Sequence, residues 1–411
     1  MDKPDYMSAG EMVRELRSAK NSLFAAVGFL AMLGLVMVYS SSWARTSDDG
    51  GAFYLFRQML WLAIGIAVSI FFYFVDYRRW VKYRHLVMLA TLAILILVLI
   101  PGIGAKINGA RRWFRFGDIG LQASEFARVG MVIFLAGFLS SNRDRISSFW
   151  RGFLPSIAFV VAGFLLIAIE PDIGMALLWA VVGGSLIFAA GARISHIFIM
   201  LVMGIPPFLL LIVTKFGYIV ERIHAFLNPV AEASGKGYQA LQSMIALGQG
   251  GLFGVGLGQS VQKMYFLPEP HTDFILAILG EELGFAGVAV VIGVYVIVAY
   301  QGLRITFWAR DTMGHLMALG ATLLISVQAA VNIGVVTGAL PTKGMALPFL
   351  SYGGSNLVSC LALVGILAGV AHHTARELKA LSPTRTFTLL PTECWPALGD
   401  LQTELPKGTE A

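Results

Sequence analysis

The chain has 411 residues, of which 57% are hydrophobic and 13% are charged, and its mean hydropathy is +0.75. A soluble domain carries about a quarter charged residues, so this composition excludes an ordinary soluble protein. The net charge of +6 comes without a basic soluble domain, and no nucleic-acid partner is expected. The two cysteines, Cys360 and Cys394, are predicted near a reducing compartment, where a disulfide is not expected.

About ten apolar segments follow one another along the chain, and they predict an all-α integral membrane protein. A membrane span needs about 20 apolar residues, and lipid offers the backbone no hydrogen-bond partners, so each segment is expected to be a helix. The predicted spans are 22–42, 56–75, 85–101, 125–141, 152–169, 173–191, 195–215, 273–300, 313–336 and 355–372.

Lys and Arg collect in alternate connections between these spans, which predicts the topology through the positive-inside rule. Both termini are then cytoplasmic. Residues 1–21 form an inner segment, 22–372 form the membrane domain, and 373–411 form a flexible inner tail. The outer segments are 102–124, 337–354 and the long loop 216–272 between spans seven and eight.

The outer segment 102–124 breaks the charge rule. Four basic residues there predict an anionic ligand at the outer leaflet, since Arg matches phosphate oxygens bidentately. Nonspecific contact with anionic lipid headgroups is the alternative. Lys343, in the segment 337–354, either reaches along the membrane surface or contacts a phosphate. The four basic residues of 102–124 are Lys106, Arg111, Arg112 and Arg115.

Asp273 stands where the long outer loop enters span eight. A carboxylate beside a water-accessible loop can accept a proton from a hydroxyl group, but Asp also commonly caps a helix. Glu281 and Glu282 follow in the same span and do not share one face with Asp273. Acidic groups inside a span are costly, so at least one is expected to have a structural, hydrogen-bonded role.

Glu125 and Arg128 lie three residues apart at the start of span four, so they are neighbours on one helix face. They form either an intrahelical ion pair or one wall of an outer cavity lined by the nearby arginines. Trp113, taken alone, is typical of an aromatic anchor at the membrane interface. The Gly-rich run Gly248–Ser260 indicates close packing more strongly than a phosphate cradle, because it lacks a strand–helix context.

The chain resembles the SEDS family (shape, elongation, division, sporulation) over about residues 20–375. Six stretches carry the resemblance, and they follow one another in the family's order and spacing. The PTKG form and the block from HTDF to EELG are more similar to division-type (FtsW) members than to elongation-type (RodA) members. The stretches are NGARRWF (108–114), LQASEFAR (121–128), EPDIG (170–174), GKGYQALQSMIALGQGGLFGVGLGQS (235–260), FLPEPHTDFILAILGEELG (266–284) and LPTKGMALPFLSYGGSN (340–356).

The resemblance implies a peptidoglycan glycosyltransferase that polymerises lipid II at the outer face of the bacterial inner membrane, at the division septum. It implies that Asp273 is the general base, that Glu125 and Arg128 are the acid–base pair of span four, and that Trp113 is the outer-loop tryptophan. A pyrophosphate leaving group would need positive charge, for which the outer Arg and Lys residues are candidates.

The implied partners are lipid II, a class B penicillin-binding protein and regulatory membrane proteins of the division machinery. No cofactor is assigned, and a divalent cation, Mg²⁺ or Mn²⁺, is left open. Two other functions are weighed against the polymerase, namely a lipid II flippase and a scaffold for a transpeptidase. A flippase would place polar groups along a path through the membrane, whereas the suggestive residues here stand at outer span ends.

Overall fold

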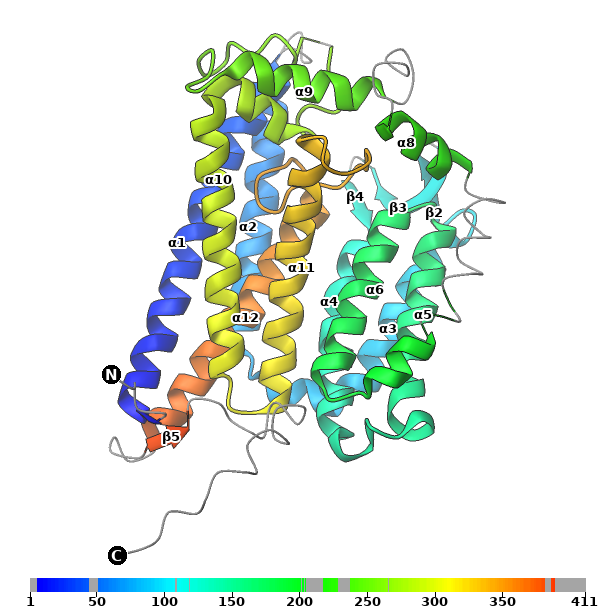
Figure 1. Cartoon of the computed structure of the whole chain (residues 1–411), viewed down its shortest axis with the longest axis vertical. Helices are drawn as coiled ribbons and strands as arrows, with labels where there is room; N and C mark the ends of the chain where they lie inside the picture. Colours follow the sequence, from blue (N-terminus) through cyan, green and yellow to red (C-terminus); the bar gives the residue numbers. More distant parts are fainter. Residues whose placement is uncertain are drawn as a thin grey trace, which may run out of the picture.

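The computed structural model describes residues 6–43, 51–107, 109–117, 119–200, 202, 204, 217–227, 237–264, 266–380 and 386–388. The helices run side by side between two ends of a bundle (Figure 1). One end carries the first turns of α1 and the last turns of α12, and the other carries α8, α9 and a small sheet. The long helices are α1 (Ala9–Ser42), α2 (Ala52–Phe74), α3 (Trp80–Leu99), α4 (Ala123–Ser141), α5 (Leu154–Ile169), α6 (Ile173–Ala189), α10 (Ile275–Trp308), α11 (Thr312–Val336) and α12 (Gly354–Ala380).

Within the described ranges, eight helices are long and apolar enough to cross a membrane, and α6 is a shorter apolar helix. The chain is therefore a multi-pass membrane protein, but the predicted count of ten spans is not confirmed. Residues 194–200 are helical, and most of the predicted span 195–215 lies outside the described residues. The long outer loop contains two helices, α8 (Gly217–Leu227) and α9 (Tyr238–Gly250).

The first and last helices extend beyond the predicted spans 22–42 and 355–372, because polar residues continue both helices. Ser8 caps α1, whose first residue is Ala9: its hydroxyl accepts from the Glu11 amide, and the Glu11 carboxylate accepts from the Ser8 amide at 2.9 Å. Residues 9–21 therefore continue the helix of the first span. At the other end, α12 reaches Ala380, and β1 (Tyr6–Ser8) pairs with β5 (Thr386–Thr388). The remainder of the predicted tail lies outside the described residues.

The prediction of an all-α chain is also wrong in the segment 102–124, which holds a three-stranded antiparallel sheet. Its strands are β2 (Gly104–Ile107), β3 (Ala110–Phe116) and β4 (Ile119–Gln122), in that order. Gly109 and Gly117 have φ of 83° and 60°, a backbone region that favours glycine, next to the β2–β3 and β3–β4 connections. The sheet fixes the direction in which the basic side chains of this segment project.

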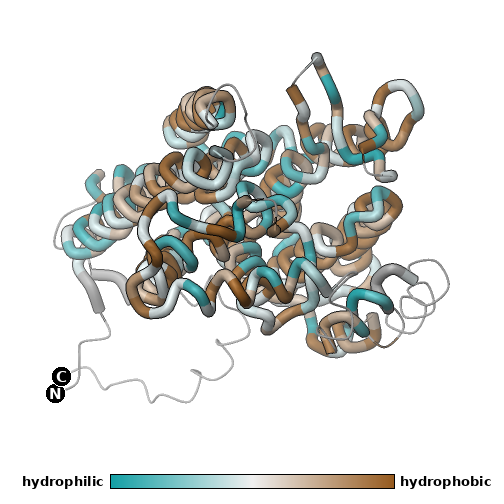
Figure 2. Tube along the Cα trace, turned by 90° about the horizontal axis from the view of Figure 1, so that it is seen from above, coloured by the Kyte–Doolittle hydropathy of each residue, from teal (hydrophilic) through white to brown (hydrophobic). Residues whose placement is uncertain are grey.

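The core of the bundle lies along α4, α11 and α12, which are largely buried. By contrast, α2 and α3 expose large hydrophobic side chains such as Phe56, Phe74 and Leu86. Outward-facing apolar residues are expected where helices meet lipid. In the view from above, hydrophobic residues (brown) occupy much of each helix (Figure 2).

Helix α10 is interrupted at Gly284, whose φ is 70°. The Gly-rich loop closes over this break, because a Cβ on Gly254 would lie 2.1 Å from the Glu282 carbonyl oxygen. The amides of Val255 and Gly256 donate to the carbonyls of Glu281 and Glu282 at 3.0 and 3.1 Å. These amides are therefore already paired, and the structure favours the packing interpretation of the Gly-rich run over a phosphate cradle.

Candidate active site

Asp273 lies in a turn immediately before α10. The residue that caps this helix is Phe274, with no side-chain capping bond, so the capping interpretation of Asp273 is wrong. The Asn332 side chain, on α11, donates to the main-chain oxygens of Asp273 at 2.8 Å and Met345 at 2.6 Å. One amide thus joins the turn of Asp273 to the outer segment that follows α11.

This segment packs directly against the Asp273 carboxyl. A Cβ on Gly344 would lie 2.5 Å from Oδ2 of Asp273, so only glycine leaves room for the carboxyl in this position. Burial raises the pKa of Asp273 to about 6, and the nearby Glu269 carboxylate acts in the same direction. Lys343 and Arg112 act against this rise. A carboxyl with a pKa near 6 is a better proton acceptor than an ordinary aspartate and is still ionised at neutral pH.

Two cavities meet at Asp273. The larger, of about 730 Å³, has a polar lining that includes Trp113, Arg115, Glu125 and Asp172. The smaller, of about 640 Å³, lies between α6 and α11. Arg222, Gln239, Thr342 and Lys343 contribute polar groups to it, and the apolar wall includes Ile173, Leu177, Leu178, Val181, Val327, Val331, Val335 and Leu340. Both cavities are lined by Arg112, Asp273, Gly344 and Met345. The carboxyl of Asp273 therefore stands between a polar and an apolar compartment.

Asp172 joins two of the predicted phosphate ligands. Its carboxylate accepts from Lys343 Nζ at 2.7 Å and pairs with Arg112 Nη1 at 3.4 Å. Burial acts to raise its pKa, but Lys343 and Arg112 outweigh burial and hold it below the ordinary value. Sequence reasoning did not single out Asp172, although it belongs to the EPDIG stretch that carried the resemblance.

The Glu125–Arg128 ion pair is confirmed, with 2.5 Å between Oε2 and Nη2, and both side chains are buried. Ser359 contacts both partners: it accepts from Arg128 at 2.7 Å and donates to Glu125 at 2.9 Å. Arg128 also donates to Gln328. Only Glu125 of the pair lines the larger cavity, so Arg128 supports the site from behind.

The other predicted basic residues divide into two groups. Arg112 lines both cavities and Arg115 lines the larger one, whereas neither lining includes Lys106 or Arg111. These two lie opposite each other in the register of β2 and β3. Their contact with phosphate stays a prediction. Trp113 faces the larger cavity and packs against Gly120, in addition to any role at the membrane interface.

Glu281 and Glu282 have the hydrogen-bonded, structural role predicted for at least one of them. Glu281 accepts from the amide of Val261 at 2.8 Å and from the Ser260 hydroxyl. Glu282 pairs with Lys263 at 2.8 Å, and both side chains are fully buried. Together they hold the outer loop against α10. Sequence reasoning did not identify Lys263.

Glu170 lies close to this site and is unusual, because neither oxygen of its buried carboxyl has a hydrogen-bond partner among the described residues. Burial raises its pKa to about 9, and the Asp172 carboxylate adds to the rise. In the part of the chain that the structure describes, no group of three or more His, Cys, Asp or Glu residues is placed to hold a metal ion. A divalent cation therefore has no identified ligand set.

Comparison with known proteins agrees with the arrangement of these stretches. A family model described as "Cell cycle protein", which covers FtsW, RodA and SpoVE, matches residues 20–376. The chain belongs to the FtsW/RodA/SpoVE family. This confirms the resemblance to SEDS proteins that the sequence motifs indicated.

Two curated relatives of this FtsW/RodA/SpoVE protein are 43% identical to it. The stage V sporulation protein E of Bacillus subtilis aligns over 84% of this chain and 94% of its own length. The probable peptidoglycan glycosyltransferase FtsW of Trichlorobacter lovleyi aligns over 85% of this chain and 92% of its own length. A solved structure titled "Structural coordination of polymerization and crosslinking by a peptidoglycan synthase complex" is 26% identical, with a TM-score of 0.70. That comparison covers 86% of this chain and 97% of the other.

Proposed function

We propose that this protein is a peptidoglycan glycosyltransferase that joins lipid II units into glycan strands at the outer face of the cytoplasmic membrane. Lipid II is an undecaprenyl-pyrophosphate disaccharide-pentapeptide. The observation that carries the proposal is the position of Asp273, between a polar and an apolar cavity and beside two cations. A substrate with a sugar head, a pyrophosphate and a lipid chain needs these three environments side by side.

In the proposed reaction, Asp273 accepts the proton of the acceptor sugar 4-hydroxyl. The oxygen attacks the anomeric carbon of the donor with inversion, and the bond from that carbon to the pyrophosphate oxygen breaks. Undecaprenyl pyrophosphate leaves with the bonding electrons. A positioned general base contributes roughly 10²–10⁴ in rate.

Arg112 and Lys343 are the strongest candidates to stabilise the leaving pyrophosphate. They stand beside Asp273, and the carboxylate of Asp172 holds both of them in position. Fixed cations aimed at developing negative charge lower the barrier without reorganisation. Arg115, which lines the larger cavity, is a further candidate.

The cavity between α6 and α11 would hold the first part of the lipid chain, since one wall of it is formed by Val, Leu and Ile side chains of these two helices. The polar cavity would hold the sugars, with Trp113 against a sugar ring and Glu125 within the lining. A flippase instead needs a polar path across the membrane. The cavities described here both end at Asp273, which favours chemistry at one face.

We further propose a class B penicillin-binding protein as partner, supported by the similarity to a chain of a peptidoglycan synthase complex. Names of relatives include both FtsW and a sporulation protein. Together with the PTKG form, these names support a division-type role at the septum, alongside regulatory membrane proteins of that machinery. The elongation-type role is the alternative.

The test is lipid II polymerisation by the purified protein with its cognate transpeptidase, followed on a gel. Wild type and Asp144→Asn are expected to make polymer, and Asp273→Asn is expected to make none. Asp144 is an exposed aspartate in the connection between α4 and α5, so it controls for the substitution itself. Equal product from Asp273→Asn and wild type would place the base elsewhere. No product from wild type with bound, active partner would favour the flippase or scaffold functions.

A further inference from the structure

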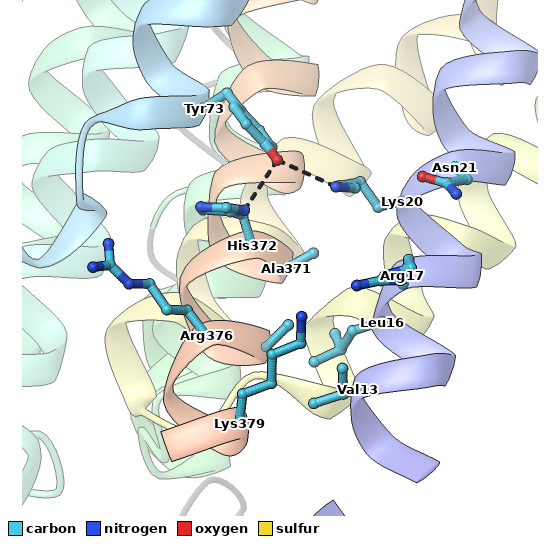
Figure 3. Close-up of a pocket in the computed structure, with 11 residues that line it drawn as sticks. Val13, Leu16, Arg17, Lys20, Asn21, Tyr73, Ala371, His372, Arg376 and Lys379 are labelled. Atoms are coloured by element: carbon cyan, nitrogen blue, oxygen red, sulfur yellow. Dashed lines mark hydrogen bonds between the residues drawn. The ribbon is translucent and has the colours of Figure 1, made fainter. Parts of the chain in front are cut away.

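A third pocket lies at the end of the bundle opposite Asp273, between α1, α12 and the last turn of α2 (Figure 3). Its volume is about 470 Å³. The predicted topology places this end on the cytoplasmic side. The lining consists of Val13, Leu16, Arg17, Lys20, Asn21, Tyr73, Ala371, His372, Ala375, Arg376 and Lys379.

The charge of this lining is entirely positive. It contains the four cations Arg17, Lys20, Arg376 and Lys379 and no carboxylate. The acidic residues of the two long helices are engaged elsewhere. In α1, Glu11 bonds Ser8 and Glu15 pairs with Arg304; in α12, Glu377 pairs with Arg78. Within the described part of the chain, none of the four cations forms an ion pair.

Part of the pocket is held in a fixed arrangement. Lys20 Nζ donates to the Tyr73 hydroxyl at 3.2 Å, and that hydroxyl lies 3.0 Å from Nδ1 of His372 (Figure 3). Tyr73 therefore joins the cation of α1 to the imidazole of α12. Arg17, Arg376 and Lys379 are exposed, so their charged groups remain free to approach a ligand.

Apart from Asn21, the remaining surface of the pocket is apolar. Val13 and Leu16 come from α1, and Ala371 and Ala375 come from α12. A smaller groove of about 300 Å³ continues between the same helices towards Arg14, and it shares Arg17 with the pocket. A cationic rim over apolar helix surface fits a molecule with an anionic head and a hydrocarbon body.

We propose that this pocket binds the phosphate of an anionic phospholipid from the adjacent leaflet, with its glycerol and first acyl carbons against the apolar surface. Arg and Lys form charge-assisted hydrogen bonds to phosphate oxygens, and basic pockets between helices on the cytoplasmic side select anionic headgroups. The bound phosphate would relieve the repulsion between the cations of α1 and α12. It would thereby hold the first and last helices together.

The experiment measures lipid binding to the purified full-length protein by native mass spectrometry and by thermal unfolding in mixed micelles. Phosphatidylglycerol is compared with phosphatidylcholine, and inorganic phosphate is the third arm. The test variant carries Arg17→Gln, Arg376→Gln and Lys379→Gln. Removing three phosphate contacts is expected to weaken phosphatidylglycerol binding by roughly 100-fold and to abolish its thermal stabilisation.

A matched control carries Arg143→Gln, Arg145→Gln and Arg151→Gln, which lie at the same end of the bundle and outside the pocket. It loses the same charge and is expected to bind phosphatidylglycerol like wild type. Equal weakening in both triple variants, or equal stabilisation by phosphatidylcholine, would overturn the proposal. Stabilisation by inorganic phosphate as strong as by the lipid would assign the pocket to a free anion and overturn the lipid assignment. A second test variant, R376K with K379R, keeps the charge and should retain binding.

Discussion

The substitution Asp273→Asn is expected to abolish polymerisation and at the same time to stabilise the fold. The rise in the pKa of Asp273 from 3.8 to about 6 means that the folded protein disfavours its ionised form. At pH 7 this corresponds to a loss of about 3 kcal/mol of folding free energy. The loss is absent well below pH 3.8, grows between pH 3.8 and about 6, and is constant above that. Asparagine carries no charge and removes it.

Thermal unfolding of purified wild type and Asp273→Asn, at pH 5 and pH 7, measures this effect. The variant should have the higher midpoint at pH 7, and the difference should shrink at pH 5. Polymerisation by wild type should fall as the pH drops below about 6, because Asp273 must be ionised to accept a proton. A lower midpoint for the variant would refute the reasoning, since it would mean that Lys343 and Arg112 stabilise the carboxylate more than burial destabilises it.

Three further substitutions test the surroundings of the site. Gly344→Ala should push the Asp273 carboxyl out of place and lower kcat by about 100-fold, with little change in thermal midpoint. The control Gly184→Ala should leave turnover unchanged, because a Cβ there meets nothing within 4 Å. Glu170→Gln should raise the thermal midpoint by an amount that grows between pH 5 and pH 8, because the pKa of Glu170 in the folded protein is about 9; a constant difference would contradict that pKa. Lys263→Met should cost about 3–5 kcal/mol of folding free energy, because it leaves the buried Glu282 carboxylate without its ion-pair partner. Thermal unfolding measures this loss, and replacing Glu282 as well should recover most of it.

The positions of most membrane helices could be predicted from the sequence because lipid leaves the backbone few alternatives. The predicted spans 125–141 and 313–336 agree closely with Ala123–Ser141 and Thr312–Val336. The ends of α1 and α12 could not be placed by hydropathy, since polar turns of a helix need no lipid. For α1, the capping box of Ser8 and Glu11 was a readable signal.

The sheet in the segment 102–124 was missed although its sequence carries a hairpin signal. Asn108 and Gly109 form the dipeptide most typical of a two-residue hairpin turn, between residues that pair in the sheet. The unusual basic charge of the segment led to a ligand hypothesis, but charge gives no information on backbone conformation. Only the pairing of the strands shows which two of the four basic residues, Arg112 and Arg115, reach a cavity.

Within the candidate site, the sequence indicated individual residues but not their partners. Asp273 stood out because a carboxylate beside a water-accessible loop can accept a proton, and Lys343 because it is a basic residue in an outer segment. Asp172 did not, although it is the residue that holds Lys343 and Arg112 in place. These partners are separated by tens of residues or more along the chain, and only the packing of α6 against α11 brings Lys343 to Asp172. Such long-range ion pairs leave no periodic signal in one sequence.

The polar residues of α11 explain how a buried ion pair can matter to a carboxyl it does not touch. Gln328 accepts from Arg128 and donates to the main-chain oxygen of Ala346 at 2.7 Å. One helical turn further, Asn332 binds the main chain of Asp273 and Met345. The segment that carries Lys343 is thus fixed at two adjacent points of one helix, and the first point is held by the ion pair of α4. Arg128 acts on the site through geometry, because its guanidinium reaches Glu125 and Gln328 at once.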